Sequence, residues 1–225
     1  MGLAPGRYAD AKWKAFPQLY GKAFRLCKRG GVVSENSPAP RRRRADARRN
    51  VDALVEAARK VFDTSGVDAP AKEITDLAGV GVGTLYRHFP QRADLVKAVV
   101  QSGIDAVADA GPALSAEYEP VEALTKWVDR FTELLGTKRG LASALHSGDP
   151  AFEGLPGYFR QRLGPALAAL LDAAAGEIRD DVGAEDLLHA IAQLCQPVPG
   201  RSPEHGKRMV AVLVDGLRRG GGERS

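Results

Sequence analysis

Apolar residues recur along this chain at the three- and four-residue spacing of amphipathic helices. Residues 51–62 are a clear example, because their valine, leucine, alanine and phenylalanine side chains fall on one continuous face. The sequence lacks the strand-forming runs that a sheet protein needs. The pattern therefore predicts an all-α fold. The predicted helices cover residues 47–64, 70–78, 82–89, 91–110, 121–135, 141–146, 158–172, 184–196 and 203–217.

Residues 74–89 predict two short helices joined by a tight turn. In the first helix, Ile74, Leu77 and Ala78 share one face. Gly79 follows directly, at a position where a helix can end with a positive φ at no steric cost. This spacing is typical of the first helix and turn of a helix-turn-helix.

The second short helix, residues 82–89, has an apolar stripe and a polar side. Leu85 and Phe89 lie four residues apart and are predicted to be core. Thr84, Arg87 and His88 then point away from that core. A helix-turn-helix places such a second helix in the DNA major groove. The segment therefore predicts a DNA-binding function.

The twelve residues Gly-Val-Gly-Val-Gly-Thr-Leu-Tyr-Arg-His-Phe-Pro (79–90) carry a family resemblance. Together with residues 91–95 behind them and residues 51–62 and 65–66 before them, they resemble the DNA-binding domain of TetR-type transcriptional repressors. The resemblance covers roughly residues 44–100. It implies an N-terminal three-helix helix-turn-helix DNA-binding domain, followed by an α-helical ligand-binding and dimerisation domain. The predicted bounds are 1–40 for an N-terminal extension, 41–95 for the DNA-binding domain, 96–219 for the second domain and 220–225 for a flexible tail.

The resemblance also implies which side chains meet DNA. It assigns Tyr86 and His88 to phosphate contact, and Val82, Gly83 and Arg87 to positions that face bases. Arg87 is the best candidate for reading a base, because its planar fork can bond both O6 and N7 of guanine.

Two further basic residues match positions of the family pattern. Lys72 stands where relatives reach bases or backbone, and Arg92 stands where they usually have a phosphate-binding lysine. The whole predicted DNA-binding set is Arg44, Arg48, Lys72, Val82, Gly83, Thr84, Tyr86, Arg87, His88 and Arg92.

Positive charge is concentrated towards the front of the chain. The net charge is +4, yet residues 1–40 carry seven Lys/Arg against two Asp/Glu, and residues 111–225 carry thirteen against sixteen. Arg41–Arg44 is an unbroken arginine run. The run predicts either a flexible basic arm along the DNA backbone or minor groove, or a solvated charged surface. Its place directly before the DNA-binding domain favours the arm.

Residues 1–40 show little amphipathic order and do not share the resemblance. We predict that they are disordered or a mis-annotated extension, since Val32 or Val33 could be a GTG start codon read as an internal valine. The sequence has no secretory signal and no apolar run approaching the ~18 residues of a membrane span. Its two cysteines, Cys27 and Cys195, lie far apart, which fits a reducing cytoplasm.

The last two predicted helices carry strong apolar stripes. These stripes predict either a dimer interface built from two helices of each subunit or an intramolecular core, and helix periodicity cannot separate the two. The resemblance favours a homodimer, whose two recognition helices would span a pseudo-palindromic operator. The predicted interface residues are Leu187, Leu188, Ile191, Leu194, Val210, Leu213, Val214 and Leu217.

Aromatic residues of the second domain offer a site for a small-molecule effector. Small-molecule sites use apolar and aromatic walls with a few polar groups. The candidate ligand-binding residues are Trp127, Phe131, His146, Tyr158, Phe159 and Gln193. Each of them has a competing role as ordinary core, and His146 is the preferred polar contact.

No pattern of catalytic chemistry competes with these assignments. The four histidines and two cysteines have no metal-ligand spacing, and no Gly-x-Ser-x-Gly elbow is present. We therefore predict no catalytic residues, no metal and no cofactor, and a ligand-released repressor that is not an enzyme. The main alternative is a helix-turn-helix regulator whose C-terminal domain responds to a protein partner; an enzyme is a distant third.

Overall fold

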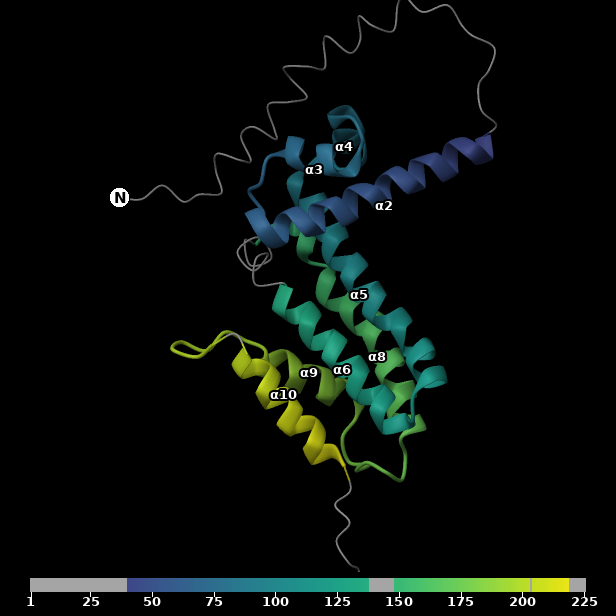
Figure 1. Cartoon of the computed structure of the whole chain (residues 1–225), viewed down its shortest axis with the longest axis vertical. Helices are drawn as coiled ribbons and strands as arrows, with labels where there is room; N and C mark the ends of the chain where they lie inside the picture. Colours follow the sequence, from purple (N-terminus) through teal and green to yellow (C-terminus); the bar gives the residue numbers. More distant parts are fainter. Residues whose placement is uncertain (1–39, 138–147, 203, 219–225) are drawn as a thin grey trace, which may run out of the picture. The chain divides into compact units, whose positions relative to one another are not determined.

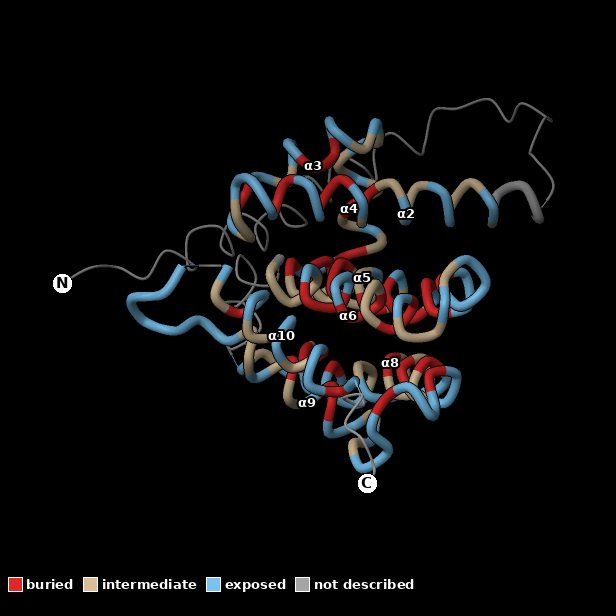
Figure 2. Tube along the Cα trace, turned by 60° about the horizontal axis from the view of Figure 1, so that its bottom comes forward, coloured by how far each residue is buried: buried red, intermediate tan, exposed pale blue. Residues whose placement is uncertain are grey.

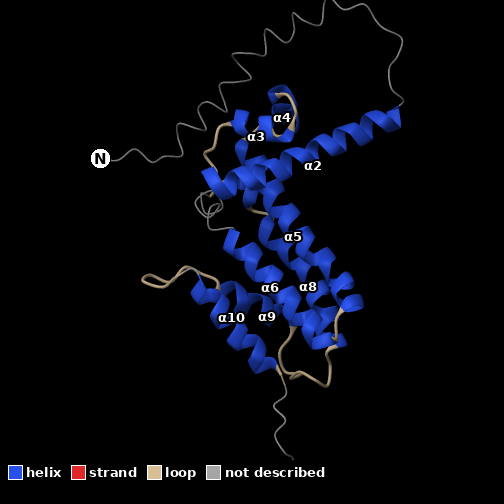
Figure 3. Cartoon of the chain, viewed as in Figure 1, coloured by secondary structure: helices blue, strands red, loops and turns tan. Residues whose placement is uncertain are grey.

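A computed structural model describes residues 40–137, 148–202 and 204–218 of the 225-residue chain. Every regular element in these residues is helical (Figures 1 and 3), which confirms the predicted all-α fold. Bridges of β type in the same residues are isolated, pairing Ile178 with Ala175 and with Arg218. The predicted helix 141–146, the tail 220–225 and the extension before Pro40 lie outside the described residues.

The chain divides into two compact units. The first comprises Met1–Val99 with Ser143–Phe152, and the second comprises Val100–Ala142 with Glu153–Ser225. The first change of unit falls at Val99, against the boundary at residue 95 predicted from the sequence. Helix α5, Arg92–Glu117, therefore begins in the first unit and continues into the second.

The first unit is built from α2 (Pro40–Ser65), α3 (Ala71–Ala78), α4 (Val82–His88) and the start of α5. Its core consists of apolar side chains from all four helices, seen as the buried positions in Figure 2. The largest of them are Leu54, Phe62, Ile74, Leu85 and Leu95, each no more than 2% exposed. The short 3₁₀ turn η3, Pro150–Phe152, belongs to the same unit.

Helix α2 begins at Pro40, seven residues before the predicted start at 47. Proline suits the first turn of a helix, and arginine is a good helix former, so the Arg41–Arg44 run continues the helix backbone. Apolar periodicity could not reveal this part, because Leu54 is the first buried side chain of α2 among those described. The predicted flexible arm is therefore wrong for residues 41–46, whose backbone is helical.

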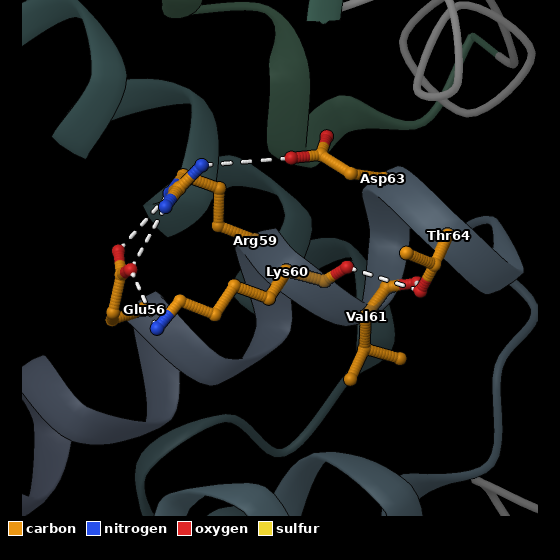
Figure 4. Close-up of polar contacts among 6 residues, drawn as sticks. All are labelled: Glu56, Arg59, Lys60, Val61, Asp63 and Thr64. Carbon is orange, nitrogen blue, oxygen red and sulfur yellow. Dashed lines mark hydrogen bonds and ion pairs between the residues drawn. The ribbon is translucent and has the colours of Figure 1, made fainter.

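The outer face of α2 carries a local ion network (Figure 4). The Arg59 guanidinium donates to both carboxylate oxygens of Glu56, at 3.0 and 2.8 Å, and lies 3.5 Å from Asp63. Lys60 lies 3.4 Å from the same Glu56 carboxylate, and these contacts lower the pKa of Glu56. Pairs at this spacing contribute only about 0.2–0.5 kcal/mol each when exposed.

The second unit contains the rest of α5 with α6 (Pro120–Thr137), α8 (Leu155–Ala173), α9 (Ala184–Leu194) and α10 (Glu204–Leu217). Helix α8 packs on both α6 and α9, and α10 packs on α9 and α6. At the α9–α10 contact, a Cβ added to Gly206 would lie 3.0 Å from the Leu194 carbonyl oxygen. Glycine therefore permits the close approach of these two helices.

Two prolines lie inside helices of the second unit, although a proline usually kinks or breaks a helix. Helix α5 was predicted to end at residue 110 but continues past Pro112, and α8 continues past Pro165. A proline costs a helix interior about 3 kcal/mol. Burial of Leu114 beyond Pro112, and of Leu167 and Leu170 beyond Pro165, offsets that cost.

Candidate nucleic-acid interface

The turn between α3 and α4 has the geometry of a helix-turn-helix. Gly79 ends α3 with φ 67° and ψ 28°, the left-handed conformation that glycine adopts without strain. The Val80 N–H donates to the Thr75 carbonyl at 3.1 Å and closes the turn. Gly81 then takes an extended conformation, and its carbonyl accepts the first bond of α4 from the Thr84 N–H at 2.8 Å.

Helix α4 is held to the first unit by its apolar side. Leu85 is fully buried and Phe89 is 7% exposed, so both are core, as predicted. Phe89 ends the helix, and its N–H donates to the Leu85 carbonyl at 2.8 Å. A seven-residue helix is too short to be stable alone, so these two anchors determine where it lies.

The other side of α4 is open to solvent. Arg87 and Gly83 are exposed, while Val82, Thr84 and His88 are partly exposed. A Cβ added to Gly83 would meet no atom within 4 Å, so a groove of DNA could approach the backbone closely there. Arg87 and His88 occupy the last turn, where positive charge stabilises the helix dipole.

Tyr86 is half-buried between the open side and the core. Burial raises the pKa of its phenol, and the nearby positive charge of Arg92 acts in the opposite direction. The phenol therefore stays protonated at neutral pH and can donate a hydrogen bond.

The basic residues predicted on α2 and α3 are exposed wherever their side chains are described. Lys72 is exposed, and its ammonium group lies 2.5 Å from the Asp76 carboxylate one turn later. Arg48 is exposed on α2. Arg44 lies in an early turn of α2, and its side chain is outside the described part of the structure.

Arg92 does not fit the phosphate contact predicted for it. Its side chain is buried, at 9% exposure, and its guanidinium donates to two backbone carbonyls of the loop between α2 and α3. One acceptor is Val67, and the other is Ala69 at 2.8 Å. The family pattern predicts a positive charge at this position, but it does not show that the forked arginine side chain points inward.

The structure brings together three of the six predicted ligand-binding residues. Trp127 and Phe131 of α6 are fully buried with ring centroids 5.8 Å apart, and Phe131 lies 5.5 Å from Phe159 of α8. The Trp127 Nε1 is buried and has no hydrogen-bond partner among the described residues. These rings form a continuous aromatic row inside the second unit, which suits a core as well as a ligand wall.

The other three ligand candidates are placed elsewhere. The Tyr158 hydroxyl donates to the carboxylate of Asp105 on α5 at 2.7 Å, and Arg162 donates to the same carboxylate at 2.6 Å. Gln193 is exposed on α9, so it does not join the aromatic row. His146 lies outside the described residues.

A surface pocket of about 280 Å³ lies at the end of α8, the following loop and the start of α9. None of the six predicted residues lines it. Its walls combine apolar side chains such as Leu171, Ile178 and Val182 with charged Asp172 and Arg179. Sequence periodicity gave no signal for it, because six of its ten lining residues come from the irregular segment between the two helices.

The apolar residues predicted to form a dimer interface are largely interior to a single protomer. Leu187, Leu188 and Ile191 of α9 are no more than 3% exposed, and Val210, Val214 and Leu217 of α10 no more than 5%. Leu194 and Leu213 keep intermediate exposure. These six side chains therefore lie in the core of the protomer, on the inward face that helix periodicity selects, and the predicted interface stays a prediction for Leu194 and Leu213.

Membrane-spanning helices and metal-binding clusters are both absent from the described residues. No helix there is both long and apolar enough to cross a bilayer. No cluster of three or more His, Cys, Asp or Glu side chains in that part of the chain is arranged to hold a metal ion.

Comparison with known proteins assigns both units to one family. Residues 54–99 match the model of bacterial regulatory proteins of the tetR family, and residues 119–219 match the C-terminal domain of SbtR-like transcriptional regulators. Curated HTH-type transcriptional regulators of Staphylococcus aureus are 41% identical over 63 residues, which is 28% of this chain and 34% of theirs. The chain thus matches about a third of the length of these curated relatives.

Solved structures extend the similarity over most of the chain. A TetR transcriptional regulator from Streptomyces coelicolor is 36% identical, with a TM-score of 0.60, and the match covers 76% of this chain and 99% of the other. A TetR transcription regulatory protein from Mycobacterium vanbaalenii is 33% identical with the same TM-score, covering 78% and 99%. The chain therefore belongs to the TetR family of helix-turn-helix transcriptional regulators.

Proposed function

We propose that this protein binds double-stranded operator DNA through α4 and represses transcription until a small molecule releases it. The observation that carries the proposal is the two-sided form of α4. Leu85 and Phe89 hold the helix from the inside, and Arg87 remains exposed on the outside. A rigidly held arginine suits base reading, because its two parallel hydrogen bonds to guanine require a fixed direction.

The DNA-contacting set that fits the exposed surface is smaller than the sequence prediction. It omits only Arg92, which is buried, and Arg44, whose side chain lies outside the described part of the structure. The positions kept to face bases are Val82, Gly83 and Arg87, and the other residues kept are Arg48, Lys72, Thr84, Tyr86 and His88. Backbone contacts position the protein on the duplex, whereas base contacts specify the sequence. Because Gly81 and Gly83 give the front of α4 few side chains, Arg87 is expected to dominate base preference.

We also propose a homodimer, with the interface moved to the outward faces of α9 and α10. Val212 on α10 is a large apolar side chain that is 65% exposed, and Ala211 beside it is exposed as well. His189 and Gln193 are exposed on α9. A helix-turn-helix dimer reads two half-sites about one helical turn, ~34–36 Å, apart, so the operator should be a pseudo-palindrome.

For the effector, we propose a small molecule bound next to the aromatic row of the second unit. Ligand entry would favour one of two dimer geometries, and it can shift their populations only as far as its affinities for them differ. An effector with a hydrogen-bond acceptor would match the buried Trp127 Nε1.

The proposal is tested by selecting sequences bound by the full chain from random duplex DNA. We expect an enriched inverted repeat, and we expect Arg87→Ala to lose preference at one position of each half-site. Selection that enriches no sequence would reject the regulator proposal. An enriched site without two-fold symmetry would reject the dimer while keeping DNA binding.

A further inference from the structure

The loop between α2 and α3 is a compact turn closed by its own backbone. The Gly66 N–H donates to the Phe62 carbonyl at 3.1 Å, and the Ala69 N–H donates to the Gly66 carbonyl at 3.2 Å. Gly66 has φ 77°, which reverses the chain direction at the end of α2. This turn leaves the carbonyls of Val67 and Ala69 available as acceptors.

Arg92 donates to both of these carbonyls from the first residue of α5. The Ala69 side chain is 3% exposed and Arg92 is 9% exposed, so the contact lies in a largely dry part of the first unit. The planar guanidinium presents parallel donors in a fixed fork, which matches two acceptors two residues apart. Removing it would leave the buried Ala69 carbonyl, and the partly buried Val67 carbonyl, without these donors.

The first turn of α5 is itself fixed, so it is a firm base for this contact. The Gln91 N–H donates to the Asp94 carboxylate at 2.9 Å, and the Asp94 N–H donates to the Gln91 carbonyl at 3.2 Å. An acidic side chain here also complements the positive end of the α5 dipole. Arg92 thus joins a rigid helix start to the loop that leads into α3.

Arg92 also lies close to the recognition helix. It is only three residues beyond Phe89, at which α4 ends, and its positive charge also acts on the phenol of Tyr86. Tyr86 follows Leu85, the buried anchor of α4. One side chain therefore lies where the α2–α3 loop, α4 and α5 meet.

We infer that Arg92 is a positioning residue for DNA recognition, which holds the α2–α3 loop and the adjacent α4 in register and does not contact phosphate. The inference rests on the proposed DNA-binding function and assigns one residue of that site a different role. A phosphate contact needs an exposed cation, whereas both terminal nitrogens of this guanidinium donate to backbone carbonyls inside the unit.

The two roles predict different binding behaviour. A lost phosphate contact weakens specific and non-specific DNA binding alike, and lowers the slope of log K against log salt by about 0.9. A lost positioning contact weakens specific binding about tenfold, because the base contacts of α4 require a fixed helix orientation and one such contact contributes about 1–3 kcal/mol, of which 1.4 kcal/mol is a factor of ten. Non-specific binding and the salt slope then stay at their wild-type values.

The experiment measures binding of the full chain to its selected operator and to a scrambled duplex, at several salt concentrations. The variants are Arg92→Ala and Arg92→Lys, with Lys60→Ala as a control that removes an exposed cation of α2. Arg92→Lys is decisive if Arg92→Ala does not fold. It preserves a phosphate contact but lacks the planar fork, so we expect it to lose specific affinity as well.

Amide hydrogen exchange gives an independent measure of the same contact. We expect faster exchange at Ala69 and Gly66 in both variants, with no change at α2 amides beside Leu54. Equal loss of specific and non-specific binding, or full affinity in Arg92→Lys with unchanged loop exchange, would overturn the inference. Failure of the proposed function itself would appear in the wild-type chain, as an absence of any preferred sequence.

Discussion

Helix α4 and the aromatic row of α6 and α8 use their side chains in opposite ways. In α4, two buried residues hold a short helix, and its polar residues stay at the surface. In the aromatic row, Trp127 and Phe131 have no exposed surface. Truncating an exposed side chain of α4 should therefore change DNA binding far more than stability, whereas truncating an aromatic side chain of the row should change the free energy of unfolding first.

Trp127→Ala should produce the largest effect and would test the buried side of this comparison. Loss of a fully buried tryptophan leaves a cavity, which typically costs about 3–5 kcal/mol of unfolding free energy. Thermal and denaturant unfolding of the full chain measure it. Trp127→Phe is the matched control, because it keeps one aromatic ring in the row and removes the Nε1 donor that lacks a described partner. If both variants are as stable as the wild type, the row does not support the second unit.

Arg87→Ala should give the next largest effect, and mainly on binding. The exposed arginine has no role in the core, so stability should fall by no more than the ~0.3–1 kcal/mol that a cation contributes at a helix C-terminus. Operator affinity should fall by about 1–3 kcal/mol, the range of a bidentate base contact. Competition between the selected operator and operators changed at single positions measures it. A loss of stability above about 1 kcal/mol would mean that α4 is not two-sided in the way described.

A pair of glycine variants sharpens the comparison by testing close packing within the second unit. Gly206→Ala puts a Cβ 3.0 Å from the Leu194 carbonyl oxygen, a backbone atom that cannot easily move. We expect a net loss of about 1 kcal/mol, since overpacking exceeds the gain in helix propensity. Gly164→Ala in α8 meets nothing within 4 Å and should instead gain about 0.5–1 kcal/mol. Opposite shifts in the melting temperature are the expected result; shifts of the same sign would contradict the α9–α10 packing.

Arg59→Ala should have the smallest effect. Its contacts with Glu56 and Asp63 lie on the exposed face of α2 (Figure 4). Removing them should cost about 0.2–0.5 kcal/mol at low salt and less in high salt. Denaturant melts at two salt concentrations measure this difference. A loss above 1 kcal/mol would show that α2 depends on its surface charges.

The sequence was most informative where a local rule and the packing agree. Leu85, Phe89 and Gly79 were all placed correctly, because a positive φ and a four-residue apolar spacing are local properties. The start of α2 was missed because an arginine-rich helix has no apolar periodicity to detect. The end of α5 was placed at residue 110, but the helix continues past Pro112 to Glu117, because distant packing outweighed a local cost.

Two parts of the site were beyond a sequence argument for a different reason. Periodicity identifies an apolar face but does not say what covers it, so Leu187 and Val210 were assigned to a partner while they lie in the protomer core. Charge identifies a cation but not its direction, so Arg92 was assigned to phosphate. Both cases concern the acceptor or neighbour of a side chain, which only the folded arrangement supplies.

The early turns of α2 contain exposed positions that can be substituted without disturbing the core. Since Leu54 is the first of the described side chains of that helix to enter the interior, substitutions at the exposed positions Arg48 and Arg49 leave the packing of its unit untouched. These two arginines can thus be exchanged one by one without endangering folding. Any sensitivity found there would report attraction to a polyanion, free of confounding collapse.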